Sequence, residues 1–345
     1  MKLWQKISLG IVAIIIVFIG KTLYNAGVFT TVEPHFNGTV TEIDGFGGAE
    51  DITFDKATGL ALISSNDFSD DSKNGAIFLL NTKENTPKPI KLTEKVTFDF
   101  HPHGISLYRT LEGAKRLFVI NHRKKGDYVE VFDFTDSTLV HLESITSSLF
   151  VSPNDIVAVG EHTFYLTNDH DEEKSDWRSK KDLLQIAMGN VCYYDGQRAK
   201  VVADGFLYAN GINISLDGKK LFVAATSGRK IRVFDRDLTT GKLTESDEIT
   251  INGADNIEID EYGNLWVGCH PKLLSYLAHS KDRSKPSPSE IIKINYQSKE
   301  YYTLESTYLN DGTPVSGSSV GAVFGDKLLI GTVFGNKVLL CTLKK

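Results

Sequence analysis

The chain has 345 residues, of which 41% are hydrophobic, so it can bury a sizeable core in one large domain or two smaller ones. Its formal net charge of -6 argues against a nucleic-acid partner, because such partners require clustered lysine and arginine. The three cysteines, Cys192, Cys269 and Cys341, fit no zinc-binding spacing and allow at most one disulfide.

The first 30 residues differ in character from the rest of the chain. Two lysines precede a mostly apolar run from Ile7 to Gly20, and Lys21 follows it. This pattern predicts a secretory signal or a membrane anchor, and the lack of a good small-x-small cleavage site favours an uncleaved signal-anchor over a cleaved signal. We therefore expect residues 1–30 to be a signal-anchor and residues 31–345 to form one domain that is membrane-anchored or secreted and lies outside the cytoplasm.

Beyond residue 40, short β-rich runs are divided by Gly, Asp and Asn, which is typical of an all-β fold. Six of these runs are self-similar. Each has a polar residue or pair, an alternating strand, a turn and a second apolar strand, and they start at residues 50, 103, 154, 210, 255 and 319. Multi-stranded repeats of about 40–50 residues indicate propeller blades. The sequence thus predicts a six-bladed β-propeller, closed by pairing of the C-terminal run NKVLLCTL with the first strands after the hydrophobic helix.

The innermost strand of each propeller blade lines a central channel, so equivalent positions of successive blades converge there. The polar residues at the repeat starts are Glu50 with Asp51, His103, Asn154 with Asp155, Asn210, Asp255 with Asn256, and Ser318 with Ser319. Carboxylates gathered in one place repel unless a cation lies among them. Carboxylate and amide oxygens suit a hard ion, which favours calcium over zinc. Asn and Asp also begin strands as ordinary turn residues, but the same phase recurring around the ring favours a metal site.

These segments resemble the paraoxonase/arylesterase family of calcium-dependent lactonases. The resemblance rests on EDI, HPHGIS, SPNDIVAVG, FYLTNDH, DNIEID and GNLWVGCHP, and runs from about Ile43 to Cys341. It implies a small-molecule lactone or ester as substrate, a retained hydrophobic N-terminus that attaches the protein to a membrane, and two calcium ions in the channel.

By motif position, the resemblance also implies the role of each site residue. The catalytic calcium would be held by Glu50, Asn154, Asn210, Asp255 and Asn256. The structural calcium would be held by Asp51, Asp155 and the backbone carbonyl of Ile105. A catalytic histidine dyad falls on His103 and His122, and the supporting residues are Asp169, His170 and His270. His101 lies outside the phase of the repeats, so we expect it in a loop.

The chemistry expected of such a site is the attack of water on a carbonyl polarised by calcium. His103 is the leading candidate for the base, because an ordinary histidine pKa of about 6.5 suits neutral pH, and His122 would orient it or relay the proton. A carboxylate ligand, Asp255 or Glu50, is the alternative base. No GxSxG motif is present, so a covalent serine mechanism has no support.

Two departures from the family pattern affect these expectations. The family closes its ring with a disulfide, and Cys341 matches one partner, but EPHFNGTVTEI contains no cysteine, so closure must rest on strand pairing. The segment after His170 is strongly charged at its start, and SKKDLLQIAM (residues 179–188) could form a short amphipathic helix. The alternative functions are a non-catalytic, calcium-stabilised binding scaffold and a related propeller of the gluconolactonase or strictosidine-synthase type.

Overall fold

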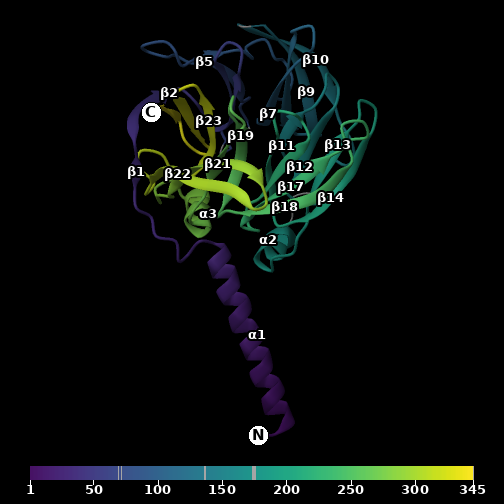
Figure 1. Ribbon diagram of the computed structural model, residues 1–345, viewed down its shortest axis with the longest axis vertical. Coiled ribbons are helices and arrows are strands. Elements are labelled where there is room, and N and C mark those ends of the chain that lie inside the picture. The colour runs from purple at the N-terminus through teal and green to yellow at the C-terminus, as the bar shows by residue number, and fades with distance from the viewer. Residues whose placement is uncertain (69, 71, 136, 173–175, 345) are drawn as a thin grey trace.

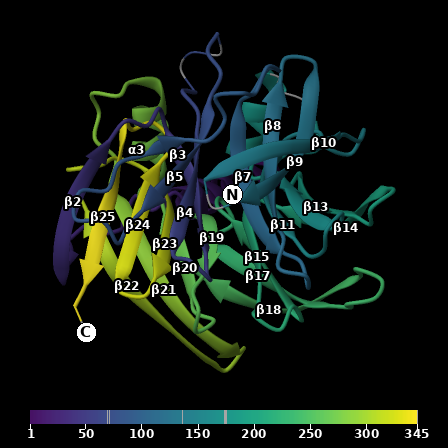
Figure 2. The same ribbon diagram turned by 90° about the horizontal axis from the view of Figure 1, so that it is seen from above.

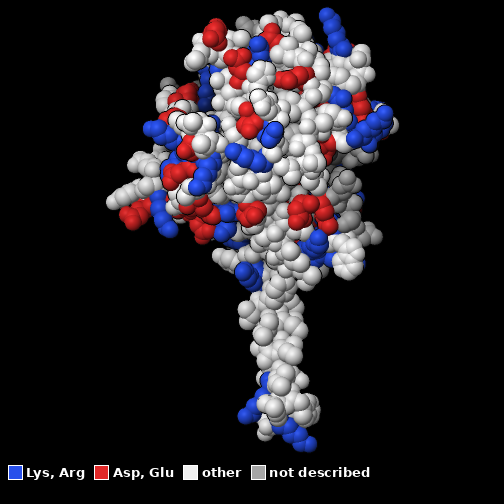
Figure 3. All heavy atoms as spheres, turned by 90° about the vertical axis from the view of Figure 1, so that its right-hand side faces the viewer, with Lys and Arg blue, Asp and Glu red and all other residues white. Residues whose placement is uncertain are grey.

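The structure is a computed structural model that describes residues 1–68, 70, 72–135, 137–172 and 176–344. It consists of a long N-terminal helix, α1 (Leu3–Asn25), and a ring of β-sheets from whose surface this helix projects (Figure 1). With 23 residues, α1 is about 35 Å long and apolar enough to cross a membrane, and none of its residues is buried. Residues 7–20 of α1 carry no charge and lysines lie only toward its ends, whereas Lys, Arg, Asp and Glu are mixed over the propeller (Figure 3).

The six repeats are six four-stranded antiparallel units arranged around a common centre (Figure 2). The inner strands are β3 (Ala49–Asp55), β7 (Pro102–Arg109), β11 (Pro153–Ala158), β15 (Ala209–Ile214), β19 (Ala254–Ile259) and β23 (Ser318–Phe324). The second strands are β4 (Leu60–Ser65), β8 (Lys115–Arg123), β12 (Phe164–Asn168), β16 (Lys220–Ala225), β20 (Leu265–Cys269) and β24 (Lys327–Thr332). The third strands are β5 (Ala76–Asn81), β9 (Gly126–Thr135), β13 (Gly189–Tyr194), β17 (Lys230–Arg236), β21 (Ser289–Ser298) and β25 (Lys337–Leu343). The outer strands are β6 (Ile90–Lys91), β10 (Thr138–Ile145), β14 (Ala199–Phe206), β18 (Leu243–Thr250), β22 (Tyr301–Asn310) and β2 (Gly38–Asp44).

The ring is closed by strands from the two ends of the chain. β2 pairs with β25 over seven residues, from Gly38 opposite Leu343 to Asp44 opposite Lys337, and completes the sixth blade. β1 (His35–Phe36) adds a short edge strand to the fifth blade. The three cysteines are free and buried, so no disulfide assists this closure. The predicted propeller, its hydrophobic N-terminal helix and its closure by the C-terminal run are confirmed; the domain division at residues 30 and 31 stays a prediction.

The core of the protein lies between the blades. Six clusters of buried apolar side chains each join two neighbouring blades, so the clusters run around the whole ring. Between blades 4 and 5, for example, Phe222 and Val233 pack with Ile257 and Val267. Burial of each large aliphatic side chain contributes about 1.5–3 kcal/mol, so the ring is stabilised at every blade interface.

Two short helices, α2 (Asp176–Leu183) and α3 (Leu273–Lys281), lie on the side of the propeller from which α1 projects (Figure 1). They follow the second strands of blades 3 and 5, β12 and β20. The helix expected over residues 179–188 extends only to Leu183, because Gln185 adopts a left-handed backbone conformation (φ 55°) that ends it. The helix α3 was not predicted from the sequence.

Candidate functional site

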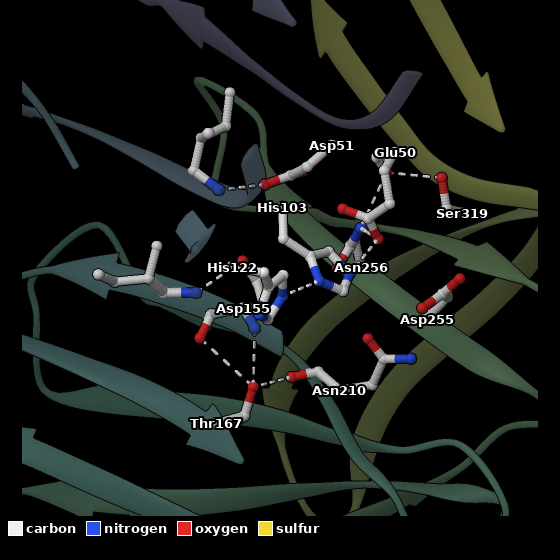
Figure 4. A network of polar contacts seen from close by, with 12 residues as sticks. Glu50, Asp51, His103, His122, Asp155, Thr167, Asn210, Asp255, Asn256 and Ser319 are labelled. Carbon is white, nitrogen blue, oxygen red and sulfur yellow. Dashed lines mark hydrogen bonds and ion pairs between the residues drawn. The ribbon is translucent and has the colours of Figure 1, made fainter. Parts of the chain in front are cut away.

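The polar residues of the six repeats occupy the second position of the six inner strands. Figure 4 shows those of β3, β7, β15, β19 and β23 gathered at one place. At this position every blade has an irregularity in the pairing of its inner and second strands, for example between Ala49 and Asp51 in β3. A bulge re-aims side chains and frees backbone groups from the ladder. It therefore allows two consecutive residues, such as Glu50 and Asp51, to serve the same centre.

Glycine follows the polar residue in two blades and lets the next blade approach closely. A Cβ on Gly104 would lie 2.6 Å from the Cα of Asp155, and one on Gly211 would lie 2.3 Å from the carbonyl oxygen of Asp255. Side chains at these positions would push the neighbouring inner strands apart. The two glycines thus set the spacing of the polar residues around the channel.

The five residues predicted to hold a catalytic calcium form what we call the oxygen cluster: Glu50, Asn154, Asn210, Asp255 and Asn256. All five are buried. The amide nitrogen of Asn256 donates to the Glu50 carbonyl oxygen (3.0 Å) and to Glu50 Oε1 (2.8 Å). The amide nitrogen of Asn210 donates to the Thr226 hydroxyl (3.1 Å). These hydrogen bonds fix the orientation of the Asn210 and Asn256 amide groups and leave their oxygens without a hydrogen-bond partner.

The free oxygens of the oxygen cluster are buried without hydrogen-bond partners. Nine buried side-chain N or O atoms lack a partner in the described part of the chain, and five of them lie at this site. They are Glu50 Oε2, Asn154 Oδ1, Asn210 Oδ1, Asn256 Oδ1 and His270 Nδ1. An unpaired buried polar group costs about 1–3 kcal/mol, so four such oxygens in one cluster fit a bound cation. Carboxylate and amide oxygens are the donors that calcium prefers.

No group of three or more His, Cys, Asp and Glu side chains is arranged to hold a metal among residues 1–68, 70, 72–135, 137–172 and 176–344. This finding is compatible with the oxygen cluster, because three of its five members are asparagines. The assignment of its residues as calcium ligands stays a prediction.

Asp51 and Asp155, which we call the carboxylate pair, follow Glu50 and Asn154 and are used differently. Asp51 accepts hydrogen bonds from the backbone N–H of Ile52 (2.8 Å) and of Ile105 in the next blade (2.8 Å). Asp155 accepts from Ile156 (2.7 Å) and from Ile212 in the next blade (2.7 Å). Each carboxylate therefore links two neighbouring inner strands.

Burial raises the pKa of both members of the carboxylate pair well above the usual range, and the charge of Glu50 raises that of Asp51 further. The charge of Asp51 also raises the pKa of Asp155, so the two carboxylates lie within electrostatic reach of each other. Burial likewise raises the pKa of Asp255, although His270 opposes the shift. A cation among these groups would relieve the repulsion that these shifts reflect.

The predicted histidine dyad borders the oxygen cluster and continues to a carboxylate. His103 Nδ1 lies 2.9 Å from His122 Nε2, and His122 Nδ1 lies 2.7 Å from Asp127 Oδ1 (Figure 4 shows the two histidines). His103 Nε2 lies 3.5 Å from Glu50 Oε1. Burial lowers the pKa of His103, but the charges of Glu50, Asp169 and Asp255 outweigh burial and raise it. Asp127 was missed in the sequence, although it lies directly opposite His122 in the β8–β9 hairpin.

The predicted supporting residues contact the cluster or the helix beside it. His270 Nε2 lies 2.8 Å from Asp255 Oδ2 and therefore orients a predicted calcium ligand. Asp169 Oδ1 accepts a hydrogen bond from Arg178 of α2 (2.5 Å) and contacts His170 Nδ1 (3.0 Å). His101 lies just before β7, as expected for a loop residue, but it is buried between Asp99 and Asn66 and has a structural role.

Aromatic side chains near the polar cluster were not predicted from the sequence. The rings of Tyr276 and His270 stack with centroids 3.7 Å apart. Phe334 lies 5.9 Å from Tyr276 and 6.4 Å from Phe68, and Phe68 lies 5.5 Å from His103. We call Phe68, Tyr276 and Phe334 the aromatic wall. It borders the site from His103 to His270.

The helix α1 joins the propeller at the same end as the oxygen cluster. Ala26 accepts a hydrogen bond from the backbone N–H of Leu273 at the start of α3, and Tyr24 accepts one from Arg229. Arg229 lies in the β16–β17 turn and Leu273 follows β20, and both connections lie at the end of the inner strands where Asn210 and Asp255 sit. The site and the apolar helix therefore share one face of the propeller.

Solved structures support the propeller fold. The structure is similar to a gluconolactonase from Xanthomonas campestris (TM-score 0.56, 16% identity, 89% of this chain and 90% of that one). It is also similar to a calcium-binding regucalcin from Agrobacterium tumefaciens (TM-score 0.53, 12% identity, 91% and 98%). At these identities the likeness concerns the fold alone, which places the protein among propellers with one inner strand per blade facing a common channel.

The sequence comparisons identify the family within this class. A family model described as Arylesterase matches residues 38–343. The human serum paraoxonase/arylesterase 2 is 37% identical over 287 residues, which are 79% of this chain and 78% of that protein. Serum paraoxonase/arylesterase 1 of Rattus norvegicus is 38% identical over 76% of this chain and 75% of that protein. The chain belongs to the arylesterase family, which confirms the predicted family and the prediction of an enzyme of the carboxylic ester hydrolase type.

Proposed function

We propose that the protein is a calcium-dependent hydrolase of lactones and aryl esters that works at the oxygen cluster. The observation that carries this proposal is the convergence of four unpartnered buried oxygens beside a His–His–Asp chain. Membership of the arylesterase family supports the reaction type, and the relatives named paraoxonase/arylesterase support ester substrates.

The oxygen cluster would hold one calcium ion, which when bound polarises a substrate carbonyl. Asn256 and His270 keep the ligand oxygens oriented through their bonds to Glu50 and Asp255. A second calcium ion would be held by the carboxylate pair and the carbonyl of Ile105, where it joins inner strands rather than reacting. The finer assignment of two ions with separate roles is part of the proposal.

His103 is proposed as the base that takes a proton from the attacking water. Its Nδ1 contact with His122, and the His122 contact with Asp127, would stabilise the positive charge that His103 gains. The proton returns to the leaving alkoxide or phenolate oxygen when the ester bond breaks. Glu50 and Asp255 remain the alternative bases, since both belong to the oxygen cluster itself.

The helix α1 is proposed to retain the protein at a membrane, with the propeller outside the cytoplasm. Its length, its apolar surface and its exposure support this placement. Because α1 joins the propeller at the end that holds the oxygen cluster, the site would open toward the membrane surface. Lactones and esters that partition into lipid would then reach the site from there.

The direct test is hydrolysis of phenyl acetate and of a panel of γ- and δ-lactones by the purified full-length protein in detergent. We expect turnover with calcium, loss of turnover with a chelator, and recovery when calcium is restored. Absence of calcium-dependent turnover for every substrate would contradict the proposal and favour a binding scaffold.

A further inference from the structure

Arg283 is an exposed cation that the proposed reaction does not use. It follows α3, and its guanidinium carbon lies 3.6 Å from the centroid of the Phe334 ring. Its Nη1 donates to the carbonyl oxygen of His279 (2.7 Å). Within the described ranges, Arg283 makes no ion pair with a carboxylate. Most of its N–H donors thus remain available while the ring holds the guanidinium in place.

Phe334 connects Arg283 to the site through the aromatic wall. The ring of Phe334 contacts Tyr276, which stacks on His270, and His270 contacts the predicted ligand Asp255. The charge of Arg283 also acts on Tyr276: burial raises the pKa of Tyr276, and Arg283 opposes that shift. Arg283 therefore lies within electrostatic reach of the wall and against the ring of Phe334.

Two carboxylates of the site have partners of their own. Asp169 is paired with Arg178, and Asp255 with His270. The acids of the oxygen cluster and the carboxylate pair would be neutralised by bound calcium under the proposed function. Arg283 is then a cation at this edge of the site with no counter-ion among the described residues, and a planar guanidinium binds a carboxylate in a two-pronged geometry.

We propose that Arg283 and Phe334 form a subsite for an anionic group, so that the enzyme prefers aryl esters and lactones that carry a carboxylate on the part lying along the aromatic wall. This inference rests on the proposed function for the reaction itself. It adds a substrate class, carboxylated esters and lactones, and a residue that determines specificity.

The test compares two nearly isosteric substrates, 4-acetoxybenzoate and 4-acetoxybenzamide, with the full-length protein in calcium at low ionic strength. Each kcat/KM is divided by the rate constant for hydrolysis by hydroxide, which corrects for the different leaving groups. We expect kcat/KM to favour the carboxylate by about 2- to 5-fold, because an exposed ion pair stabilises a complex by about that factor. Added salt should reduce this preference. Arg283→Gln should reduce the ratio to about 1, and Arg283→Lys should retain part of it.

The matched control is Lys281→Gln, which removes one positive charge from the same helix end without a contact to Phe334. It should keep the wild-type ratio. A ratio of 1 or less in the wild type, or a preference that survives Arg283→Gln, would overturn the proposal. The same result from Lys281→Gln as from Arg283→Gln would also overturn it, because the effect would then be one of net charge.

A binding measurement separates this inference from the proposed function. Binding of 4-hydroxybenzoate, the product released from 4-acetoxybenzoate, can be measured without turnover. Ligand-observed NMR compares its binding with that of 4-hydroxybenzamide. If phenyl acetate is not hydrolysed, the proposed function fails, and weaker binding of 4-hydroxybenzoate by Arg283→Gln would still support the subsite. If phenyl acetate is hydrolysed and Arg283→Gln binds 4-hydroxybenzoate as tightly as the wild type, only the subsite is wrong. Thermal unfolding of each variant confirms that the fold is retained.

Discussion

The oxygen cluster and the carboxylate pair contain similar residue types one position apart on the same inner strands, yet their oxygens are used in opposite ways. Both oxygens of Asp51 and both of Asp155 accept backbone hydrogen bonds, and one oxygen of each joins its blade to the next. In the cluster, Glu50, Asn154, Asn210 and Asn256 each keep an oxygen without a partner. The comparison teaches that the carboxylate pair already joins neighbouring inner strands through the backbone, whereas the cluster has unpartnered oxygens, which we propose to bind an ion.

The largest effect is expected from removing Asp255, the proposed charged ligand that His270 contacts. Asp255→Ala should lower calcium-dependent hydrolysis of phenyl acetate by more than about 100-fold, because it removes a proposed ligand and leaves His270 without its partner. The matched control is Asp247→Ala, a buried aspartate of the outer strand β18. Normal activity in Asp255→Ala would refute the ligand assignment.

A change in the carboxylate pair should act on stability instead. Asp51→Ala removes the acceptor of two buried N–H groups, each worth about 1–3 kcal/mol, and should lower the Tm in saturating calcium by on the order of 5 °C or more. Asp51→Asn keeps one acceptor oxygen and should lose less. A variant with an unchanged Tm and reduced turnover would contradict the division between the two groups.

A substitution in the His103–His122–Asp127 chain should have a smaller effect, on the reaction rate alone. Asp127→Asn removes the charge that stabilises a protonated His122, so kcat should fall by about 10-fold or more and the acid limb of its pH profile should move to lower pH. Calcium affinity should not change, because Asp127 does not contact the oxygen cluster. An unaltered kcat would favour Glu50 or Asp255 as the base.

The pH dependence of stability sharpens the comparison further. Burial holds the folded-state pKa of Asp51 and Asp155 above the unfolded value of about 3.9, so the folded chain retains protons that the unfolded chain has released. In chelator, these two groups favour folding at low pH, and their contribution is lost as the pH rises through the folded pKa. Calcium should replace the protons, so its stabilising effect should grow between about pH 5 and pH 8.

The measurement is the difference in Tm with and without calcium across this pH range. Asp51→Asn is the control, because it removes one titrating group from the pair. A difference that shrinks as the pH rises would contradict the assignment of the carboxylate pair to an ion.

Much of the architecture could be predicted from the sequence because a propeller repeats its pattern. The six polar starts fall at the second position of the six inner strands, and the pairing of the C-terminal run with β2 follows from the need to close the ring. Periodicity carries this information, since each blade must bury the same faces against its neighbours.

The geometry of the site was less accessible from the sequence. The irregular pairing beside each polar residue depends on contacts with the next blade, as Gly104 and Asp155 illustrate. The aromatic wall joins Phe68, Tyr276 and Phe334 from three separate connections, which no local pattern relates. Asp127 could have been found, because the short β8–β9 turn places it opposite His122.

Calcium stoichiometry tests the central claim most directly. After gel filtration in a low-calcium buffer, elemental analysis of the full-length protein should find two calcium ions per chain, and Asp255→Ala should lose one of them while remaining folded. A wild-type protein that binds no calcium, or an Asp255→Ala variant that retains both ions, would contradict the account of a cluster whose free oxygens hold an ion.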